Sequence, residues 1–326
     1  MHKIIVAGCG GISSAWLNVV SGRDDCIITA LVDTVIENAQ AKKAEYSLVC
    51  SVYDSLEAAC DKEDADIVID VTPPGQHYIT VTTALKAGRH VFGEKPMADC
   101  LDSAEKMIRC SDDTKKEYFV MQNYRYVPEI CAIKDLLHSV KLGCAGQISA
   151  NFQLNPHFGG FRDEMDSPLV LDMSIHTFDA ARFLLGKNPV SVYCHEFNPA
   201  WSWYKGDAGA VCIFEMENGA VFDYRGCWCA PGLFTPWNSE WRVSCANGGI
   251  YWDGGSKMYW DADNSGPNQI LPQTDIKTGH AGCISDMFDA LDKGTRPATD
   301  CRDNINSIRM VYKAIESSRV KKVIQF

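Results

Sequence analysis

The stretch Met1–Ser13, MHKIIVAGCGGIS, decides the fold of the first half of the chain. Residues 4–7 form a short apolar run with the composition of a buried β-strand, and an apolar helical pattern over residues 12–20 begins directly after the glycines. A strand, a tight glycine turn and a helix in this order are the setting in which a Gly-x-Gly-x-x-Gly/Ala pattern indicates dinucleotide binding.

Each residue of this turn has an expected task. We predict that Gly8 allows the tight turn and that Gly10 lets the backbone approach a pyrophosphate. The helix that opens at Gly11 and Ile12 would then hold this anion with its free N–H groups and positive end. The third small position is Ser13, where glycine or alanine is usual. A glycine turn can also serve a simple strand–helix connection, so the motif needs a second sign.

That second sign is Asp33, which ends the apolar run of residues 27–32. An acidic residue at the end of the second strand accepts hydrogen bonds from the ribose hydroxyls of NAD. Its charge would repel the 2′-phosphate of NADP, and Thr34 supplies no compensating positive charge. We therefore predict NAD as the cofactor. A role for Asp33 in capping the next helix is compatible with this prediction.

Composition limits the remaining possibilities. A chain of 326 residues is long enough for two domains, and a net charge of −11 argues against a nucleic-acid surface. No apolar stretch approaches the ~20 residues of a membrane helix, and the N-terminus leads directly into a strand, with no signal peptide expected. The fifteen cysteines are scattered without a Cys-x-x-Cys pair. We expect reduced thiols in a cytoplasmic protein, without a disulfide framework or a zinc site.

Strands and helices alternate up to about residue 121. We expect helices ending near 45 and over 55–61, 77–87 and 101–114, with further strands over 65–71, 89–92 and 118–121. This alternation predicts an α/β fold with a doubly wound parallel sheet.

The pattern changes near residue 123. We expect a helix over 128–139, a strand over 146–154, a loop over 155–168, a helix over 169–185, antiparallel strands between 190 and 260, helices over 281–291 and 304–318, and a last short strand near 323. The predicted domains are therefore 1–122 and 123–326. Seven of the eight tryptophans lie between 201 and 260. We favour packing for most of them, and leave open sugar stacking by Trp201 and Trp203, which would share one face of an extended segment.

Two loops should lie at the edge of the parallel sheet where ligands bind. Thr72, Pro73 and Pro74 follow one strand, and His77 begins the next helix. Lys95 follows the next strand and is fixed by the proline after it, so it could stabilise an alkoxide or orient a hydroxyl. A solvated loop lysine is an equal alternative on general surface statistics.

Asp172, His176 and Asp179 share one face of the helix predicted over 169–185. His176 has a carboxylate one turn away at Asp172, which suits a general base that accepts a hydroxyl proton. A structural core histidine is the alternative, and is the commoner case for a histidine taken at random. A metal site formed by Asp172, His176 and His157 matches no strong ligand spacing.

Together these motifs resemble the glucose-fructose oxidoreductase/inositol dehydrogenase/rhizopine-catabolism (Gfo/Idh/MocA) family over nearly the whole chain. They are, in order, Gly8-x-Gly10, Asp33, Thr72-Pro73-Pro74 with His77, Glu94-Lys95-Pro96 and Asp172-x-x-x-His176. The resemblance implies a Rossmann domain followed by an α+β domain with a large, mostly antiparallel open sheet. In this family that sheet commonly forms the oligomer interface, which implies a homodimer or homotetramer.

The resemblance also implies an activity. Family enzymes mostly oxidise a secondary alcohol of a sugar or cyclitol with NAD, or run the reverse reduction. Lys95 matches the lysine that contacts substrate and assists proton transfer, His176 the catalytic histidine, and Asp172 its carboxylate partner. Glu94 and Asn123 are further expected cofactor contacts. Expected substrate contacts include Arg125, His157 and Arg162, in loops expected to face the pocket.

Two departures and two alternatives stay open. Ser13 replaces a smaller residue, and residues 166–171 lack the glycines that many members have there, so the substrate cannot be transferred from any one relative. The family also includes glycosidases that recycle bound NAD, and a non-catalytic regulator that binds the dinucleotide as a signal. The intact set of Lys95, Asp172 and His176 argues against the regulator.

Overall fold

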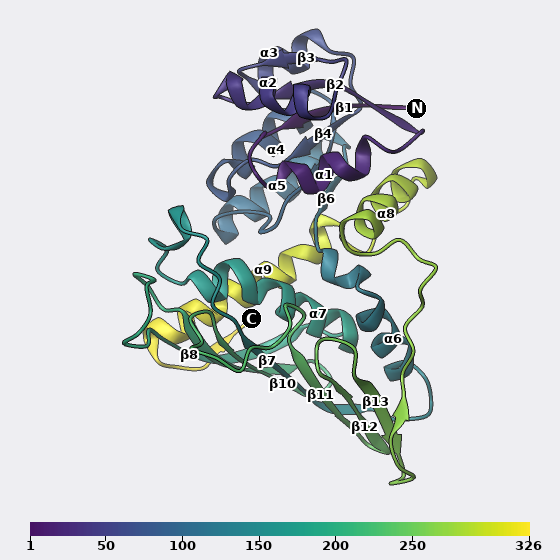
Figure 1. The fold of residues 1–326 in the computed structure, drawn as a ribbon, viewed down its shortest axis with the longest axis vertical. Helices are drawn as coiled ribbons and strands as arrows, with labels where there is room; N and C mark the ends of the chain where they lie inside the picture. The colour runs from purple at the N-terminus through teal and green to yellow at the C-terminus, as the bar shows by residue number, and fades with distance from the viewer. The chain divides into compact units, whose positions relative to one another are not determined.

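The computed structural model describes residues 1–326, which divide into two compact units (Figure 1). Unit 1 comprises Met1–Asn123 and Lys277–Ile305, and unit 2 comprises Tyr124–Ile276 and Asn306–Phe326. This division differs from a single cut after residue 122, because the segment 277–305 packs with the N-terminal part of the chain. A late helical segment carries no local signal of which core it joins.

Unit 1 is built on a parallel six-stranded sheet with the order β3-β2-β1-β4-β5-β6. Its strands are β1 His2–Ala7, β2 Cys26–Val32, β3 Ser51–Tyr53, β4 Ile67–Asp70, β5 His90–Gly93 and β6 Tyr118–Val120. The central strands read as continuous apolar runs because helices cover both faces of a parallel sheet. The predicted doubly wound parallel sheet is confirmed.

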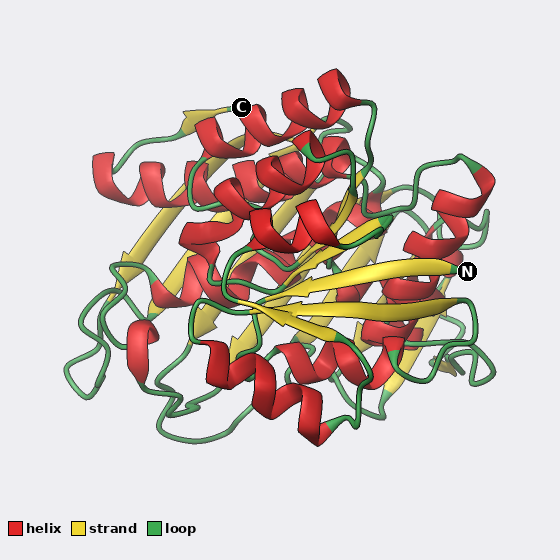
Figure 2. Ribbon diagram, turned by 90° about the horizontal axis from the view of Figure 1, so that it is seen from above, coloured by secondary structure: helices red, strands yellow, loops and turns green.

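The helices of unit 1 lie beside these strands (Figure 2). They are α1 Ser13–Val20, α2 Ile36–Glu45, α3 Leu56–Lys62, α4 His77–Lys86, α5 Leu101–Thr114 and α8 Gly279–Lys293. α4 packs against α3 and α5, and α1 packs against α8. α8 therefore completes one helical layer, although it is more than 150 residues from β6 in the sequence.

The register of the sheet gathers the predicted loops at one edge. Ala7, the last residue of β1, pairs with Val32 on one side and with Asp70 on the other, and Asp70 pairs with Gly93. The strand order reverses at β1, whose neighbours are β2 and β4. Ligands of such sheets bind at this kind of switch point, outside the carboxyl ends of the strands.

Unit 2 contains a nine-stranded sheet with the order β14-β13-β12-β11-β7-β10-β9-β8-β15. All neighbours are antiparallel except β7 and β10. The strands are β7 Ala145–Gln153, β8 Pro189–Phe197, β9 Gly209–Met216, β10 Val221–Cys227, β11 Glu240–Cys245, β12 Gly248–Trp252, β13 Met258–Ala262, β14 Asn268–Gln269 and β15 Ile324–Gln325. The predicted large, mostly antiparallel sheet is confirmed.

Burial alternates along the strands of unit 2, so one face of the sheet belongs to the core. Helices α6 Pro128–Leu137 and α7 Ile175–Leu185 pack against each other, and α7 is buried along almost its whole length. Residues 169–174 directly before α7 form a π-helical turn. α9 Cys301–Val320 begins in unit 1 and continues into unit 2. No helix in the structure is both long and apolar enough to cross a bilayer.

Candidate active site

The glycine turn between β1 and α1 has the local structure that a pyrophosphate requires. Gly8 has φ +95°, and a Cβ there would lie 2.5 Å from the carbonyl oxygen of Val71, so no other residue fits. A Cβ on Gly10 or Gly11 would meet nothing within 4 Å. The space beside these two glycines is thus open at the N-terminus of a helix, where an anion is stabilised. The residues present fit a dinucleotide.

The structure explains why a serine fits at position 13, where the usual motif has glycine or alanine. The side chain is fully buried, and its hydroxyl donates a hydrogen bond to the carbonyl oxygen of Gly10 at 2.6 Å. The serine therefore closes the turn while remaining small enough for α1 to pack closely.

Asp33 links the second strand to the glycine turn. Its Oδ2 accepts a hydrogen bond from the Cys9 N–H at 2.9 Å, and its Oδ1 accepts one from the Val35 N–H at 2.9 Å. Oδ1 also accepts a hydrogen bond from the Asn38 side-chain amide at 3.3 Å. A carboxylate can accept about four hydrogen bonds in total, so this partly exposed group keeps capacity for a ribose hydroxyl. The cap of α2 is Val35, so Asp33 orders the loop before the helix and does not cap it.

Buried polar groups form hydrogen bonds that hold the loop after β4 in place. The Thr72 hydroxyl donates to Oδ1 of Asp70 at 2.6 Å, and burial raises the pKa of Asp70. His77 is fully buried, with Nε2 2.7 Å from the Thr72 carbonyl oxygen and Nδ1 3.0 Å from that of Pro96. The prediction that His77 contacts cofactor needs correction, because a fully buried ring can only position this loop. Pro73 and Pro74 remain at the surface of the turn.

Glu94 is the centre of a buried polar cluster at the end of β5. Its Oε1 accepts a hydrogen bond from the Trp16 indole at 2.7 Å and lies 3.8 Å from Nε2 of His280. Its Oε2 accepts one from the backbone N–H of Lys95 at 3.0 Å. Burial alone would raise the pKa of Glu94, but His280, the charge of Lys95 and Trp16 together hold it below its usual value.

This cluster includes two residues that the sequence analysis missed, Trp16 and His280. Trp16 ties α1 to Glu94, and its position on the buried face of α1 was the only available signal. His280 lies in the first turn of α8, with Nδ1 3.5 Å from the side-chain nitrogen of Asn123. Nothing in the sequence relates His280 to residues more than 150 positions earlier. Asn123, a predicted cofactor contact, has a buried side-chain oxygen without a hydrogen-bond partner, which a ligand could use.

In unit 2, His176 lies in the first turn of α7 and is nearly buried, with 7% of its surface exposed. The Tyr124 ring stacks on it with 4.5 Å between centroids. Asp172 lies one turn earlier, in the π-helical segment, and its carboxylate accepts a hydrogen bond from Nε of Arg162 at 2.6 Å. The structure thus brings three predicted residues, His176, Asp172 and Arg162, into one local arrangement.

One neighbouring prediction, that Arg125 contacts substrate, is corrected. Arg125 is 6% exposed and binds Asp179 in a forked pair, with N–O distances of 2.8 and 2.7 Å. Ser307 donates to the same carboxylate. Arg125 therefore stabilises the core of unit 2 and has no surface left for substrate. Asp179, which shares a helix face with Asp172 and His176 in the sequence, is a buried structural partner of Arg125.

His157 lies in the exposed loop before α7, and its ring stacks on Trp203 at 3.6 Å between centroids. The segment 198–208 is a loop, so Trp201 and Trp203 do not share a strand face as predicted. Trp201 is 62% exposed, and its indole donates to the carbonyl oxygen of Cys229. No group of three or more histidine, cysteine or carboxylate side chains is placed to hold a metal ion.

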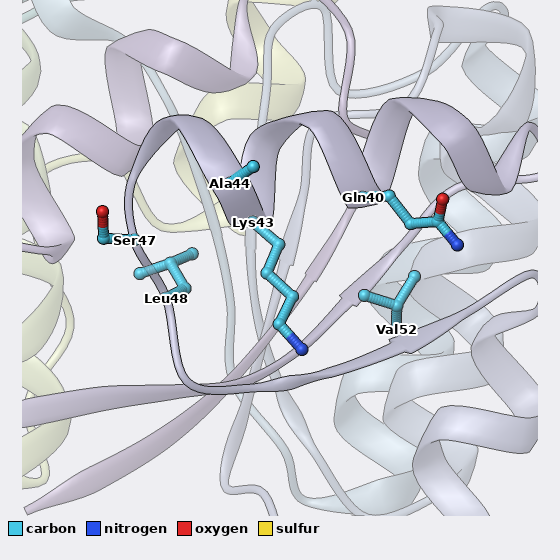
Figure 3. Close-up of a pocket in the computed structure, with 6 residues that line it drawn as sticks. All are labelled: Gln40, Lys43, Ala44, Ser47, Leu48 and Val52. Carbon is cyan, nitrogen blue, oxygen red and sulfur yellow. The ribbon is translucent and has the colours of Figure 1, made fainter.

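Unit 1 also has an open surface hollow (Figure 3). It is lined by Gln40, Lys43, Ala44, Ser47, Leu48 and Val52. The Lys43 ammonium donates to the Cys50 carbonyl oxygen at 2.6 Å and is engaged in joining α2 to β3. The last turn of α2 lies at the opposite end of this helix from the loop of Asp33, so this hollow is separate from the dinucleotide edge.

Two family profiles match the chain. An oxidoreductase family with an NAD-binding Rossmann fold matches residues 2–122, and the GFO/IDH/MocA C-terminal domain matches residues 130–251. An uncharacterized protein of Sinorhizobium fredii is 26% identical over 99% of this chain and 95% of that protein. The inositol 2-dehydrogenase of Rhizobium meliloti is 29% identical over 57% of this chain. That alignment spans 55% of the enzyme, about half its length.

Solved structures share the whole fold. An oxidoreductase from Agrobacterium radiobacter, solved with NAD+, L-tartaric acid and magnesium, has a TM-score of 0.91 at 20% identity over 99% of this chain and 98% of that chain. A putative myo-inositol dehydrogenase from Sinorhizobium meliloti has a TM-score of 0.82 at 22% identity over 100% and 99%. The resemblance expected from the motifs, and NAD as the cofactor, are confirmed by the family profiles. Because these profiles match more than half of its residues, the chain belongs to the GFO/IDH/MocA oxidoreductase family, with an NAD-binding Rossmann fold at its N-terminus.

Proposed function

We propose that the protein is an NAD-dependent dehydrogenase that reversibly oxidises a secondary hydroxyl of a sugar, sugar derivative or cyclitol. The observation that carries this proposal is the arrangement of His176, Asp172 and Arg162 in a chain of this family. Named relatives act on such compounds: an inositol 2-dehydrogenase, and a 1,5-anhydro-D-fructose reductase of Ensifer adhaerens that is 25% identical over 69% of each chain.

Each residue has a defined part in this reaction. NAD, when bound, supplies the acceptor for the hydride. His176 accepts the hydroxyl proton, and stacking on Tyr124 fixes the plane of its ring. The Lys95 ammonium stabilises the developing alkoxide, and its backbone is held by Glu94. Asp172 orients the catalytic groups and is itself held by Arg162.

The dinucleotide is assigned to the edge of the unit 1 sheet. We expect Gly10, Gly11 and Ile12 to contact the pyrophosphate and Asp33 the ribose. Thr72, Pro73, Pro74, Glu94, Lys95 and Asn123 are the remaining proposed contacts. The open space beside Gly10 and the buried oxygen of Asn123 support this assignment.

The proposed substrate contacts that remain in unit 2 are His157, Arg162, Asp172 and His176. We further propose a cytoplasmic homodimer or homotetramer. All fifteen cysteines are free thiols, which is usual in a reducing compartment. Tyr193, Val211 and Ile213 are apolar side chains exposed on the nine-stranded sheet, and they would be covered in an oligomer.

The direct test is His176→Ala. It should lower turnover by roughly 10²–10⁴-fold, because a general base is lost, and leave NAD affinity unchanged. His195→Ala, an exposed histidine on β8, is the matched control and should retain turnover. Unchanged turnover in the His176 variant would refute its role as the base.

A further inference from the structure

Six residues of unit 2 form a series of contacts that begins at His176 and ends at Asp172, which lies four residues earlier in the sequence. We call it the aromatic circuit; its members are His176, Tyr124, Trp237, Phe158, Arg162 and Asp172. The Tyr124 ring stacks on His176, and its hydroxyl donates to the Trp237 carbonyl oxygen at 2.9 Å. The Trp237 and Phe158 rings lie 6.2 Å apart, centroid to centroid.

The series reaches Asp172 through Arg162. Its guanidinium lies over the Phe158 ring, 5.2 Å from the centroid, and its Nε donates to Asp172 at 2.6 Å. Asp172 precedes His176 by four residues. Trp237 and Phe158 are therefore linked to Tyr124, which stacks on the proposed base, and to Asp172, which lies one helical turn before it.

Two aromatic members of the circuit, Phe158 and Trp237, are exposed. Phe158 is 54% exposed and Trp237 45%, although apolar rings of this size are normally covered. Trp228 is fully buried, and its ring centroid lies 6.1 Å from that of Phe158. Phe158 and Trp237 are thus partly exposed rings, and Phe158 packs beside the buried Trp228 with the Arg162 guanidinium over its ring. Rings held in this way suit the apolar C–H face of a sugar.

The charges of this region disfavour a phosphorylated ligand. Arg162 is the only cation of the circuit and is already paired with Asp172. The residues that follow it, Asp163 and Glu164, are both acidic. A phosphate or diphosphate placed here would meet a guanidinium whose charge is already offset by Asp172, followed in the chain by two acidic residues.

We propose that Phe158 and Trp237 form a subsite for a second, uncharged sugar ring, so that the substrate is a glycoside or oligosaccharide whose reacting ring is presented to His176. This inference rests on the proposed dehydrogenase function and specifies its substrate class. It assigns specificity to two residues that no motif of the sequence indicated.

The test uses the full-length protein with saturating NAD. Calorimetry and NADH absorbance are measured for neutral monosaccharides, the disaccharide of each, and the 6-phosphate of each. In at least one series the disaccharide should bind about tenfold more tightly than the monosaccharide, the scale expected of one stacking contact. The 6-phosphate of that series should bind more weakly than either.

Phe158→Ala should reduce the ratio of disaccharide to monosaccharide affinity toward one. Phe234→Ala is the matched control, because Phe234 is a phenylalanine of similar exposure, 52%, outside the circuit, and it should keep the ratio. Equal affinities with monosaccharide turnover would overturn the subsite and leave the dehydrogenase intact. Tighter binding of the 6-phosphate would also overturn the subsite. If no carbohydrate of either size binds or reacts, both the subsite and the proposed function are wrong.

Discussion

At the scale of single residues, two glycines of the same turn have separable tasks. Gly8 has positive φ and lies against the Val71 backbone, whereas Gly10 borders open space. Gly8→Ala should lower the free energy of unfolding by at least about 2 kcal/mol, because the methyl group cannot be accommodated. Gly10→Ala should keep the stability and weaken NAD binding, because its methyl group occupies the space proposed for the pyrophosphate. Denaturant titration and NAD calorimetry of both variants separate the effects; equal stability of the two would contradict this account.

Glu196 on β8 is a second residue with a measurable signature. It is 7% exposed, and burial raises its pKa from 4.5 to about 7. The folded state therefore binds more protons than the unfolded state between pH 4.5 and 7, and stability must fall as pH rises through that window. Over the whole window this carboxyl changes the free energy of unfolding by about 3 kcal/mol.

Glu196→Gln should remove this dependence. The parent should lose up to about 3 kcal/mol of unfolding free energy through Glu196 between pH 5 and pH 8. The variant should not show this loss. Glu164→Gln, at an exposed carboxylate of the same unit, is the control and should leave the difference unchanged. A pH profile identical to the parent in the Glu196 variant would show that this carboxyl is not responsible.

At the scale of elements, α7 is held by a buried ion pair. Arg125 and Asp179 are both nearly inaccessible, and Ser307 of α9 completes the carboxylate's hydrogen bonds. Arg125→Met should destabilise the fold by about 3–5 kcal/mol, because Asp179 loses its principal cation. The double variant Arg125→Met/Asp179→Leu should recover most of this loss, since it leaves no unpaired charge. Thermal and denaturant unfolding provide the measurement, and a double variant no better than the single one would contradict the argument.

The long periodic elements could be predicted from sequence, and the short or irregular ones could not. The helix Leu101–Thr114 was predicted at its observed bounds, because its apolar period is regular. Strand β3 has three residues, too few for a pattern, and the π-helical turn before α7 looks like ordinary helix in the sequence. The tryptophans at 201 and 203 would share one face if residues 198–208 were extended, but turns and the packing of Trp203 on His157 decide the path of this loop.

The same distinction applies to the candidate site. Loop positions next to strand ends were identified from the order of motifs, since strand ends fix where such loops lie. The orientation of a side chain depends on residues distant in the sequence: Arg125 turns to Asp179, and Glu94 to His280. No local pattern records such pairs, which is why Arg125 was expected at the substrate and His280 was missed.

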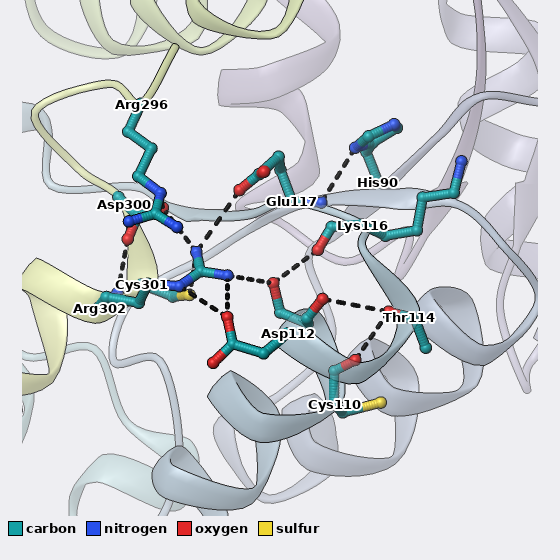
Figure 4. A network of polar contacts seen from close by, with 11 residues as sticks. His90, Cys110, Asp112, Thr114, Lys116, Glu117, Arg296, Asp300, Cys301 and Arg302 are labelled. Atoms are coloured by element: carbon teal, nitrogen blue, oxygen red, sulfur yellow. Dashed lines mark hydrogen bonds and ion pairs between the residues drawn. The ribbon is translucent and has the colours of Figure 1, made fainter. Parts of the chain in front are cut away.

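At the scale of the whole molecule, the segment 277–305 completes unit 1. Phe288 of α8 meets Phe92 edge-on at 5.2 Å, and Arg23 lies over the Phe288 ring. Arg302 then joins this segment to Asp112 of α5 at 3.0 Å and to Glu117, the residue before β6, at 3.5 Å (Figure 4). Asp300 of the same segment accepts a further hydrogen bond from this guanidinium at 3.0 Å.

A fragment of residues 1–123 should therefore be incompletely folded. Without α8 it exposes Phe92 and the face of α1, and we expect binding of a hydrophobic dye and a broad, low thermal transition. The same fragment joined by a short flexible linker to residues 277–305 should unfold cooperatively. If the fragment alone unfolded as sharply as the joined version, the segment 277–305 would be dispensable for unit 1.

The most direct test of the central claim is absorbance in the NADH band when the full-length protein is mixed with a panel of cyclitols, aldoses, sugar acids and glycosides. The account predicts that the signal grows with NAD and at least one of these substrates. It should not grow with NADP, because Asp33 repels the 2′-phosphate. A flat trace with every substrate, whether or not glycosides are consumed, would contradict a dehydrogenase that releases NADH.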